Sequence, residues 1–500
     1  GMCSERRMSD KDTQKIPRYQ RLARLLDKFW SFLDYRVVEA KKASHRRGVA
    51  ILLVLTYIAV MTATVLSGYS NSQVSFSISA NVRDDLKAYY KAKSALNLGR
   101  LMLTYQYELE QDEFFGQRIK RSNFQLYQIM DLLMMPFKTG IVSVDVPNAG
   151  RTIASYNLKE AGVDAMGDET GDYTVKVYPE AGRINLNKFS GGANQKDLYE
   201  LCMMFASPEY DDLFNARGFK STGLSRMELI AAMIDWVDGD SEKTFINNEC
   251  VLEESSGDES SLYVDQRKKY KVKNAKYTTL DELYEVAGVG DDFMEAFGDA
   301  FTVYPVEKIN VNLASAKVLY SALCNAVDVE KSGNAENKIW ACADPTIGTQ
   351  LFALAMALEG YQQFVSNPMN LLYVYTVENQ TSVIPGVVPT GTVVPFRTVS
   401  EFYKVLKALI EDSEQLPKFL LYSPTAYLMF GDRVLTMTSA GLALSNLTFN
   451  TTQLYANITT SSPKVFRVVA IGEYGGTKRT LTTVMDFNTT GGKYLYWREY

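Results

Sequence analysis

An abrupt change from polar to apolar residues divides the first hundred positions of the chain. Basic side chains end at Arg47, and no charged residue occurs from Val49 to Val82. The first part of this stretch, 49–66, is almost purely apolar and is long enough for a membrane-spanning helix. Helical spacing of apolar residues then continues to about Tyr107. The pattern predicts one unbroken helix, spanning a membrane with its first part and packing on a folded domain with its second.

Alternation of apolar and polar residues predicts strands in two regions. Tyr173–Tyr178 alternates, and Arg183–Asn187 follows it after a turn at Gly182, which together predict a hairpin. Three further strands are predicted in the tail, at Lys464–Gly472, at Lys478–Asp486 after the turn Gly475-Gly476, and at Lys493–Trp497.

Helical spacing predominates in several segments before and between these strands. Residues 115–145 are predicted to form a loop and a helix, and the basic stretch 16–40 an amphipathic helix on the inner membrane surface. Ser400 is a candidate N-cap for the helix that begins near Thr398. The other predicted helices cover 195–206, 225–237, 279–287, 291–297, 314–325 and 350–361.

Charge is unevenly distributed along the chain. The first 48 residues hold thirteen Lys and Arg against six Asp and Glu, a balance of +7. Since the whole chain carries −5, residues 49–500 carry −12. An acidic domain of this kind argues against nucleic acid as a main partner and is compatible with cation binding. Basic residues before an apolar span stay in the cytoplasm, so residues after about Ser67 are expected outside it.

Histidine and cysteine usage narrows the possible chemistry. His45 is the only His of the chain, which excludes Ser-His-Asp and Cys-His catalysis from residues 49–500. A carboxylate-only or Ser-Lys enzyme has no recognisable motif here, so we expect no enzyme. Four Cys follow the apolar segment and allow two disulfides in three possible pairings, among which a short loop closed by Cys324 and Cys342 is preferred. These four residues are Cys202, Cys250, Cys324 and Cys342.

An acidic cluster follows the helix predicted at 225–237. Asp235, Asp238 and Asp240 surround Gly239, and hard oxygen ligands at this density suit Ca²⁺. The spacing is not that of an EF-hand, and a solvated acidic loop is the alternative interpretation. A second motif, Gly288-Val-Gly290 between two helices, is typical of helix-hairpin-helix DNA-binding proteins. Asp291 and Asp292 follow it directly and would repel phosphate, which favours a structural role.

The basic-to-apolar junction resembles the class III signal of type IV pilins and pseudopilins. That resemblance implies cleavage after Gly48, so that the mature chain begins at Val49 and carries N-methylation. Most pilins have Glu at the fifth mature position, where this chain has Leu53, a departure typical of the K-type minor pseudopilins of general secretion pathways. A signal anchor that is never cut is the alternative.

Further motifs resemble the K-type family in the same order along the chain. Arg183-Ile-Asn-Leu-Asn187 matches its Gly-(Lys/Arg)-Ile-Asn-Leu-Asn segment, and Asp235-Trp-Val-Asp-Gly-Asp240 matches its Asp-Trp-x-Asp-x-Asp segment. Lys308–Ala316 repeats the Ile-Asn-x-Asn pattern. Gly257–Tyr263 matches a Gly-Ala-Glu-Asp-x-Tyr-Tyr segment, with Asp258 replacing Ala and Ser260 replacing Asp. The resemblance implies calcium binding, and the candidate metal ligands are Asp235, Asp238, Asp240, Glu249, Asp258 and Glu259, with Asp265 in reserve.

The implied fold class is α+β, a type IV pilin-like fold in which a long N-terminal helix packs on a small antiparallel sheet and a large α-helical insertion is added. The expected parts are a cytoplasmic basic leader 1–48, a transmembrane helix 49–68, a pilin-like helix with first strands 69–190, a helical insertion with the acidic loop 191–345, a mixed extension 346–460 and pilin-like strands 461–500.

The resemblance implies assembly rather than catalysis. The protein is expected in the bacterial inner membrane with one pass and a periplasmic C-terminal domain. It would be cut by prepilin peptidase and would cap the tip of a type II secretion pseudopilus with I-type, J-type and major pseudopilins, helping to initiate its assembly. A minor tip pilin of a type IV pilus and a membrane-anchored DNA-binding protein are the alternatives.

Overall fold

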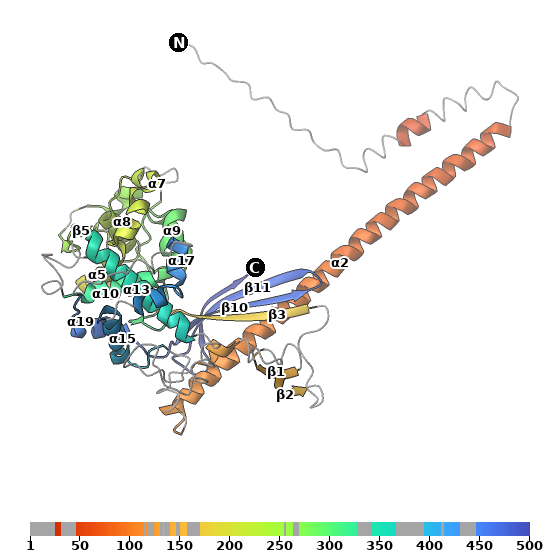
Figure 1. The fold of residues 1–500 in the computed structure, drawn as a ribbon. Helices are drawn as coiled ribbons and strands as arrows, with labels where there is room; N and C mark the ends of the chain where they lie inside the picture. The colour runs from red at the N-terminus through yellow and green to blue at the C-terminus, as the bar shows by residue number, and fades with distance from the viewer. Residues whose placement is uncertain are drawn as a thin grey trace, which may run out of the picture. The chain divides into compact units, whose positions relative to one another are not determined.

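The chain divides into two compact units, Gly1–Arg83 and Asp84–Tyr500, joined within one long helix. The structure is a computed structural model (Figure 1). It describes residues 26–31, 47–114, 116–117, 125–130, 134, 141–146, 151–157, 171–254, 257–263, 270–328, 342–366, 395–411, 415–430 and 447–500.

Helix α2, Arg47–Gln111, is unbroken over 65 residues, as the sequence predicts. In the first unit its apolar side chains are exposed, and an 18-residue window with mean hydropathy 2.5 contains no buried residue. This segment is a candidate membrane span by length and composition. Residues 26–31 are also helical, and the rest of the amphipathic segment predicted at 16–40 lies outside the described residues.

The second unit contains a four-stranded antiparallel sheet in the order β12-β11-β10-β3. The three tail strands predicted from alternation are confirmed, and β3 from the middle of the chain completes the sheet by pairing with β10. The strands are β3 Gly171–Pro179, β10 Val465–Tyr474, β11 Thr477–Asp486 and β12 Lys493–Glu499.

The C-terminal half of α2 packs on this sheet through small residues (Figure 1). Ala92 and Ala95 are fully buried, in one core with Val468 and Ala470 of β10. At Gly472 the helix approaches so closely that an added Cβ would lie 2.1 Å from the carbonyl oxygen of Ala88. The helix backbone therefore rests against the strand backbone, which only a residue without a side chain permits.

A large helical region is inserted between β3 and β10, which confirms the predicted α+β class. Its main core is separate from the core under α2. Its longer helices are α5 Gln195–Phe205, α8 Arg226–Asp235, α9 Asp291–Phe297, α10 Ala316–Ala326, α13 Pro345–Ser366, α15 Val399–Glu411, α16 Gln415–Leu420, α17 Pro424–Phe430 and α19 Thr451–Asn457. Its shorter helical elements are η3 Leu186–Gly191, η4 Pro208–Tyr210, α6 Asp211–Asn215, α7 Arg217–Lys220, η5 Glu259–Tyr263, η6 Leu280–Glu285 and η7 Gly298–Ala300. One further short helix, η1 Leu126–Ile129, precedes β3.

The hairpin predicted for Tyr173–Tyr178 and Arg183–Asn187 is wrong. The second segment, β4 Ile184–Asn185, pairs in parallel with β7 Phe301–Thr302 and not with β3. Gly182 has a φ of +90°, and an added Cβ would lie 2.7 Å from the backbone of Leu313. The turn is therefore packed against the helical region and directs the chain into it.

The two Ile-Asn-x-Asn segments begin two structural repeats. In the first, the Asn187 side chain donates to the carbonyl of Tyr277 and accepts from its N–H. In the second, Asn312 makes the same two hydrogen bonds with Phe396. The strands match as well, since β8 Ile309–Asn310 pairs in parallel with β9 Ile458–Thr459 as β4 does with β7. The similarity noted in the sequence is thus a repeated fold element.

Several smaller predictions have mixed outcomes. The disulfides are Cys202–Cys250 and Cys324–Cys342, which confirms the preferred short loop. The cap of α15 is Thr398, whose hydroxyl accepts from the N–H of Glu401, so Ser400 as the cap is wrong. Two strand pairs were not predicted from the sequence, namely the hairpin of β1 Ile141–Val146 with β2 Arg151–Asn157 and the small pair of β5 Phe245–Ile246 with β6 Leu252–Glu253. Strand β1 corrects the end of the segment 115–145, which was predicted as loop and helix.

Candidate metal centre

The acidic cluster is built where α8 ends. Helix α8 begins with a capping box between Ser225 and Glu228 and buries most of its length, which fixes Asp235 at its last position. A helix C-terminus disfavours negative charge, so a carboxylate there is in an unfavourable position unless a cation compensates it. The Thr244 N–H donates to Asp235 Oδ1 at 2.8 Å, whereas the buried Oδ2 accepts no hydrogen bond from the described residues.

The loop after α8 brings the second acidic motif alongside the first. A bridge between Glu242 and Asp258 and a 3.0 Å hydrogen bond from the Lys243 N–H to the Gly257 carbonyl hold the two chain segments together. Helix η5 starts at Glu259 and turns that side chain toward the end of α8. The disulfide from Cys250 to Cys202 ties the same loop to α5.

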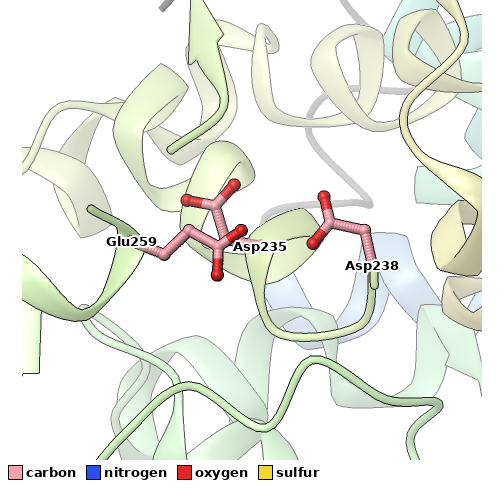
Figure 2. Close-up of side chains that lie close together, drawn as sticks. All are labelled: Asp235, Asp238 and Glu259. Atoms are coloured by element: carbon pink, nitrogen blue, oxygen red, sulfur yellow. The ribbon is translucent and has the colours of Figure 1, made fainter. Parts of the chain in front are cut away.

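Asp235, Asp238 and Glu259 form one group of buried carboxylates (Figure 2). One oxygen of each lies within 4.8 Å of the others, and the three residues are 1%, 3% and 1% exposed. Asp235 Oδ2, Asp238 Oδ1 and Glu259 Oε1 are buried and accept no hydrogen bond from the described residues. Three desolvated acceptors without donors are costly unless a cation binds them.

The electrostatics of the group agree with its geometry. Burial is the largest cause that raises the pKa of each carboxyl, to about 6 for Asp235, about 7 for Asp238 and about 8 for Glu259. Repulsion adds to burial, because Asp235 and Asp240 raise the pKa of Asp238, and Asp235 and Asp238 raise that of Glu259. Near neutral pH the group therefore either holds protons or holds a cation.

The residues present fit a hard divalent cation. All three candidate ligands are carboxylates, and oxygen-only donor sets suit Ca²⁺ or Mg²⁺ rather than the softer transition metals. Ca²⁺ takes about six to eight oxygens at flexible angles, so carbonyl oxygens or water would complete a site that begins with three carboxylates.

The other predicted ligands that the structure describes are not members of this buried group. Asp240 is exposed and its Oδ1 accepts from the Glu242 N–H, yet its charge raises the pKa of both Asp238 and Glu259. Asp258 is exposed, and its Oδ1 accepts from the Ser260 N–H. Glu249 is exposed at the turn before Cys250, and Asp265 lies outside the described residues. The structure thus groups three of the six predicted carboxylates.

Asn274 is a candidate ligand that the sequence analysis missed. Its Nδ2 donates to the Asp240 carbonyl, and its buried Oδ1 has no hydrogen-bond donor among the described residues. Its side chain also lowers the pKa of Glu259 through a hydrogen bond. A left-handed φ of 46° at this position is a conformation that Asn tolerates better than most residues, but a lone Asn in a Lys-rich stretch gives no local signal of a ligand.

The predicted processing residues lie at the start of α2. Gly48 and Val49 follow Arg47, the first residue of the helix, and Leu53 is 55% exposed one turn later. In the other glycine motif, Gly288 has a φ of +91° and Asp291 and Asp292 are exposed in the first turn of α9. Two carboxylates in the first turn of α9 would repel a phosphate at this helix N-terminus.

No protein-family model and no curated protein matches the chain. Among solved structures, the chain is similar to one chain of the crystal structure of the GspK-GspI-GspJ complex from the enterotoxigenic Escherichia coli Type 2 Secretion System. The identity is 10% and the TM-score 0.37, and the alignment covers 84% of this chain and 99% of that chain.

Proposed function

We propose that this protein is a K-type minor pseudopilin of a type II secretion system. The observation that carries the proposal is the continuity of α2, whose exposed apolar part runs directly into a part that packs on a four-stranded sheet. A filament subunit needs this construction, because one helix must serve as membrane anchor, filament core and support for the folded domain. The ordered K-type motifs support the same assignment.

The proposed role is structural and depends on assembly. Prepilin peptidase would cut after Gly48, and the mature chain would assemble with I-type and J-type pseudopilins, as the K-type motifs imply. Leu53 suits the tip of the filament, where no carboxylate is needed to pair with the amine of a subunit above and none is buried unpaired. The insertion between β3 and β10 adds bulk that the tip position tolerates.

We further propose that Ca²⁺ occupies the group of Asp235, Asp238 and Glu259. Its role would be to stabilise the insertion, since the cation would join the end of α8 to η5 across the loop. The orphaned buried oxygens support this proposal.

The decisive experiment is N-terminal sequencing and intact mass of the protein from its native membrane. We expect a chain that begins at Val49, and a Gly48→Val variant that keeps its leader. An intact leader in cells with active prepilin peptidase would contradict the proposal.

Deleting the gene distinguishes a secretion pseudopilin from a type IV pilin. Retention of exported enzymes in the periplasm supports a pseudopilin, whereas loss of surface pili with normal secretion would indicate a type IV pilus.

A further inference from the structure

A pocket with aromatic walls lies beside the Gly288-Val-Gly290 turn. Its cavity volume is about 460 Å³, which is within the range of ligand-binding sites. Elements from three parts of the chain line it, namely the short helices α6 and α7, residue Tyr270, and the segment from η6 to α9. The aromatic side chains in its lining are Phe214, Phe219, Tyr270, Tyr284 and Phe293.

The charge of the pocket has one sign. Asp291 and Asp292 are its charged lining residues, and no Lys or Arg is among the described residues that line it. Both carboxylates are exposed, so they face solvent at the side of a cavity whose remaining lining combines five aromatic residues with aliphatic residues, Gly and Thr222. Aromatic rings and carboxylates together attract an ammonium or guanidinium group, and they offer no favourable interaction to an anion.

The space beside the carboxylates is open. A Cβ added at Gly218 would have Asp292 Oδ2, at 3.9 Å, as its nearest neighbour, and one added at Gly290 would meet nothing within 4 Å. Among the described residues, Asp292 therefore has open space on its Gly218 side.

The same wall already accepts a cation on one of its rings. The Arg226 guanidinium lies 4.4 Å from the centre of the Phe214 ring and pairs with Asp211. Arg226 is not part of the pocket lining, but its contacts show the ring-and-carboxylate arrangement that the pocket repeats with Asp291 and Asp292.

We propose that this pocket binds an Arg or Lys side chain of a partner protein. The cation would lie against the aromatic rings, and its charge would face Asp291 and Asp292. The proposal is independent of the calcium centre and of the pseudopilin assignment, since it rests on the lining of the pocket alone.

The test uses the full chain in detergent micelles and the peptide Gly-Gly-Arg-Gly-Gly as the probe. Saturation-transfer NMR should detect saturable binding that weakens as salt is raised, because exposed charges are screened. The same peptide with citrulline, a neutral isostere of Arg, should bind roughly five- to tenfold more weakly. Equal binding of both peptides, or no saturable binding of the Arg peptide, would overturn the proposal.

Two variants locate the probe. An Asp291→Asn, Asp292→Asn double variant should lose the preference for Arg over citrulline, whereas an Asp212→Asn, Glu295→Gln control, with the same charge change at exposed residues outside the pocket, should keep it. Gly218→Leu should block binding by filling the space next to Asp292. Normal circular dichroism and melting of each variant confirm that it is folded, and a preference unchanged by both pocket variants places the probe elsewhere and refutes the site.

Further measurements distinguish a partner protein from two alternative occupants of the pocket, the chain's own cations and a small amine. The sequence Arg267-Lys268-Lys269 precedes Tyr270, and the three can be replaced together by Gln. If the peptide binds only to that variant, the chain's own cations are the occupant and the proposal fails. If free agmatine binds far more tightly than the Arg peptide, the ligand is a small amine and the proposal of a protein partner fails as well.

Discussion

At the scale of single residues, the acidic group poses a choice between protons and a cation. Asp235, Asp238 and Glu259 are buried close together, and burying even one unpaired charge costs several kcal/mol of folding free energy. Asn or Gln at these positions would avoid this cost, whereas this chain has a carboxylate at all three. A bound cation makes them favourable, because its charge replaces the protons that burial would otherwise require.

Replacing one ligand of this group should weaken calcium binding strongly. We expect Glu259→Gln to lower the affinity for Ca²⁺ by roughly tenfold or more, since one anionic donor of three is lost. Isothermal titration calorimetry on the chelator-treated protein measures the change. Asp258→Asn is the matched control, because it removes an equal charge from the neighbouring exposed residue and should have the smaller effect. A larger loss for Asp258→Asn would place the ligands elsewhere.

The metal-free protein should become less stable as the pH rises. The pKa values of about 6, 7 and 8 in this group exceed those of unfolded Asp and Glu, so the folded state binds more protons between about pH 4 and pH 8. The free energy of unfolding should therefore fall through this window, and the contribution of the protonated group is fully lost above the highest of the three pKa values.

Urea unfolding at a series of pH values checks this sign. With excess chelator the decline should be present, and with saturating Ca²⁺ it should shrink or disappear, because the loaded carboxylates are already ionised. Glu259→Gln should flatten the decline in the chelated protein. Stability that rises with pH over the same window under chelation would contradict the assigned pKa directions.

At the scale of elements, α2 and the sheet are held together by backbone contact. Gly472 of β10 admits the helix at Ala88 and Ala92, and Gly99 of the helix leaves room for Val175 of β3. Salt bridges reinforce the contact at the ends, where Arg479 pairs with Asp85 and Lys464 with Glu110. The contact depends on glycine at positions 472 and 99, so a larger residue at either position would push the helix and the sheet apart.

Gly472→Ala should separate the helix from the strand. The new Cβ would lie 2.1 Å from the Ala88 oxygen and 2.4 Å from the Ala92 nitrogen, so backbone must move, at a cost of about 2 kcal/mol or more of stability. Gly191→Ala is the control, since an added Cβ there meets nothing within 4 Å and should change stability little. Chemical denaturation measures both, and equal stabilities of the two variants would disprove the close approach.

The elements that could be predicted are those in which apolar residues recur at a regular spacing within the element itself. Helix α2, α5, α10 and the tail strands all show this periodicity locally. The parallel pairs of β4 with β7 and of β8 with β9 join segments far apart in the chain, which no local pattern encodes. The candidate metal centre divides in the same way, since Asp235 and Asp238 share one turn, whereas Asn274 reaches the group only through the fold.

At the scale of the whole molecule, two hydrophobic cores stabilise different parts of the second unit. One core lies between α2 and the sheet, and the other fills the helical insertion. Glu180, which is fully buried, connects them, because it pairs with Arg467 of β10 and accepts from the Thr302 hydroxyl of β7. The candidate metal centre belongs to the insertion, on the side of the second core.

Removing calcium should therefore loosen the insertion and leave the pilin-like core intact. The cation would join the end of α8 to η5, so hydrogen exchange in chelator should accelerate in these two segments and in β5–β6 of the loop between them. Exchange should remain unchanged in residues 88–103 of α2 and in β10 and β11. Mass spectrometry of exchanged peptides resolves these segments. In Glu259→Gln the exchange of the loop should already be fast and respond little to chelator. If chelator accelerated hydrogen exchange equally in both cores, the cation would stabilise the molecule as a whole. The two cores would then not unfold independently of each other.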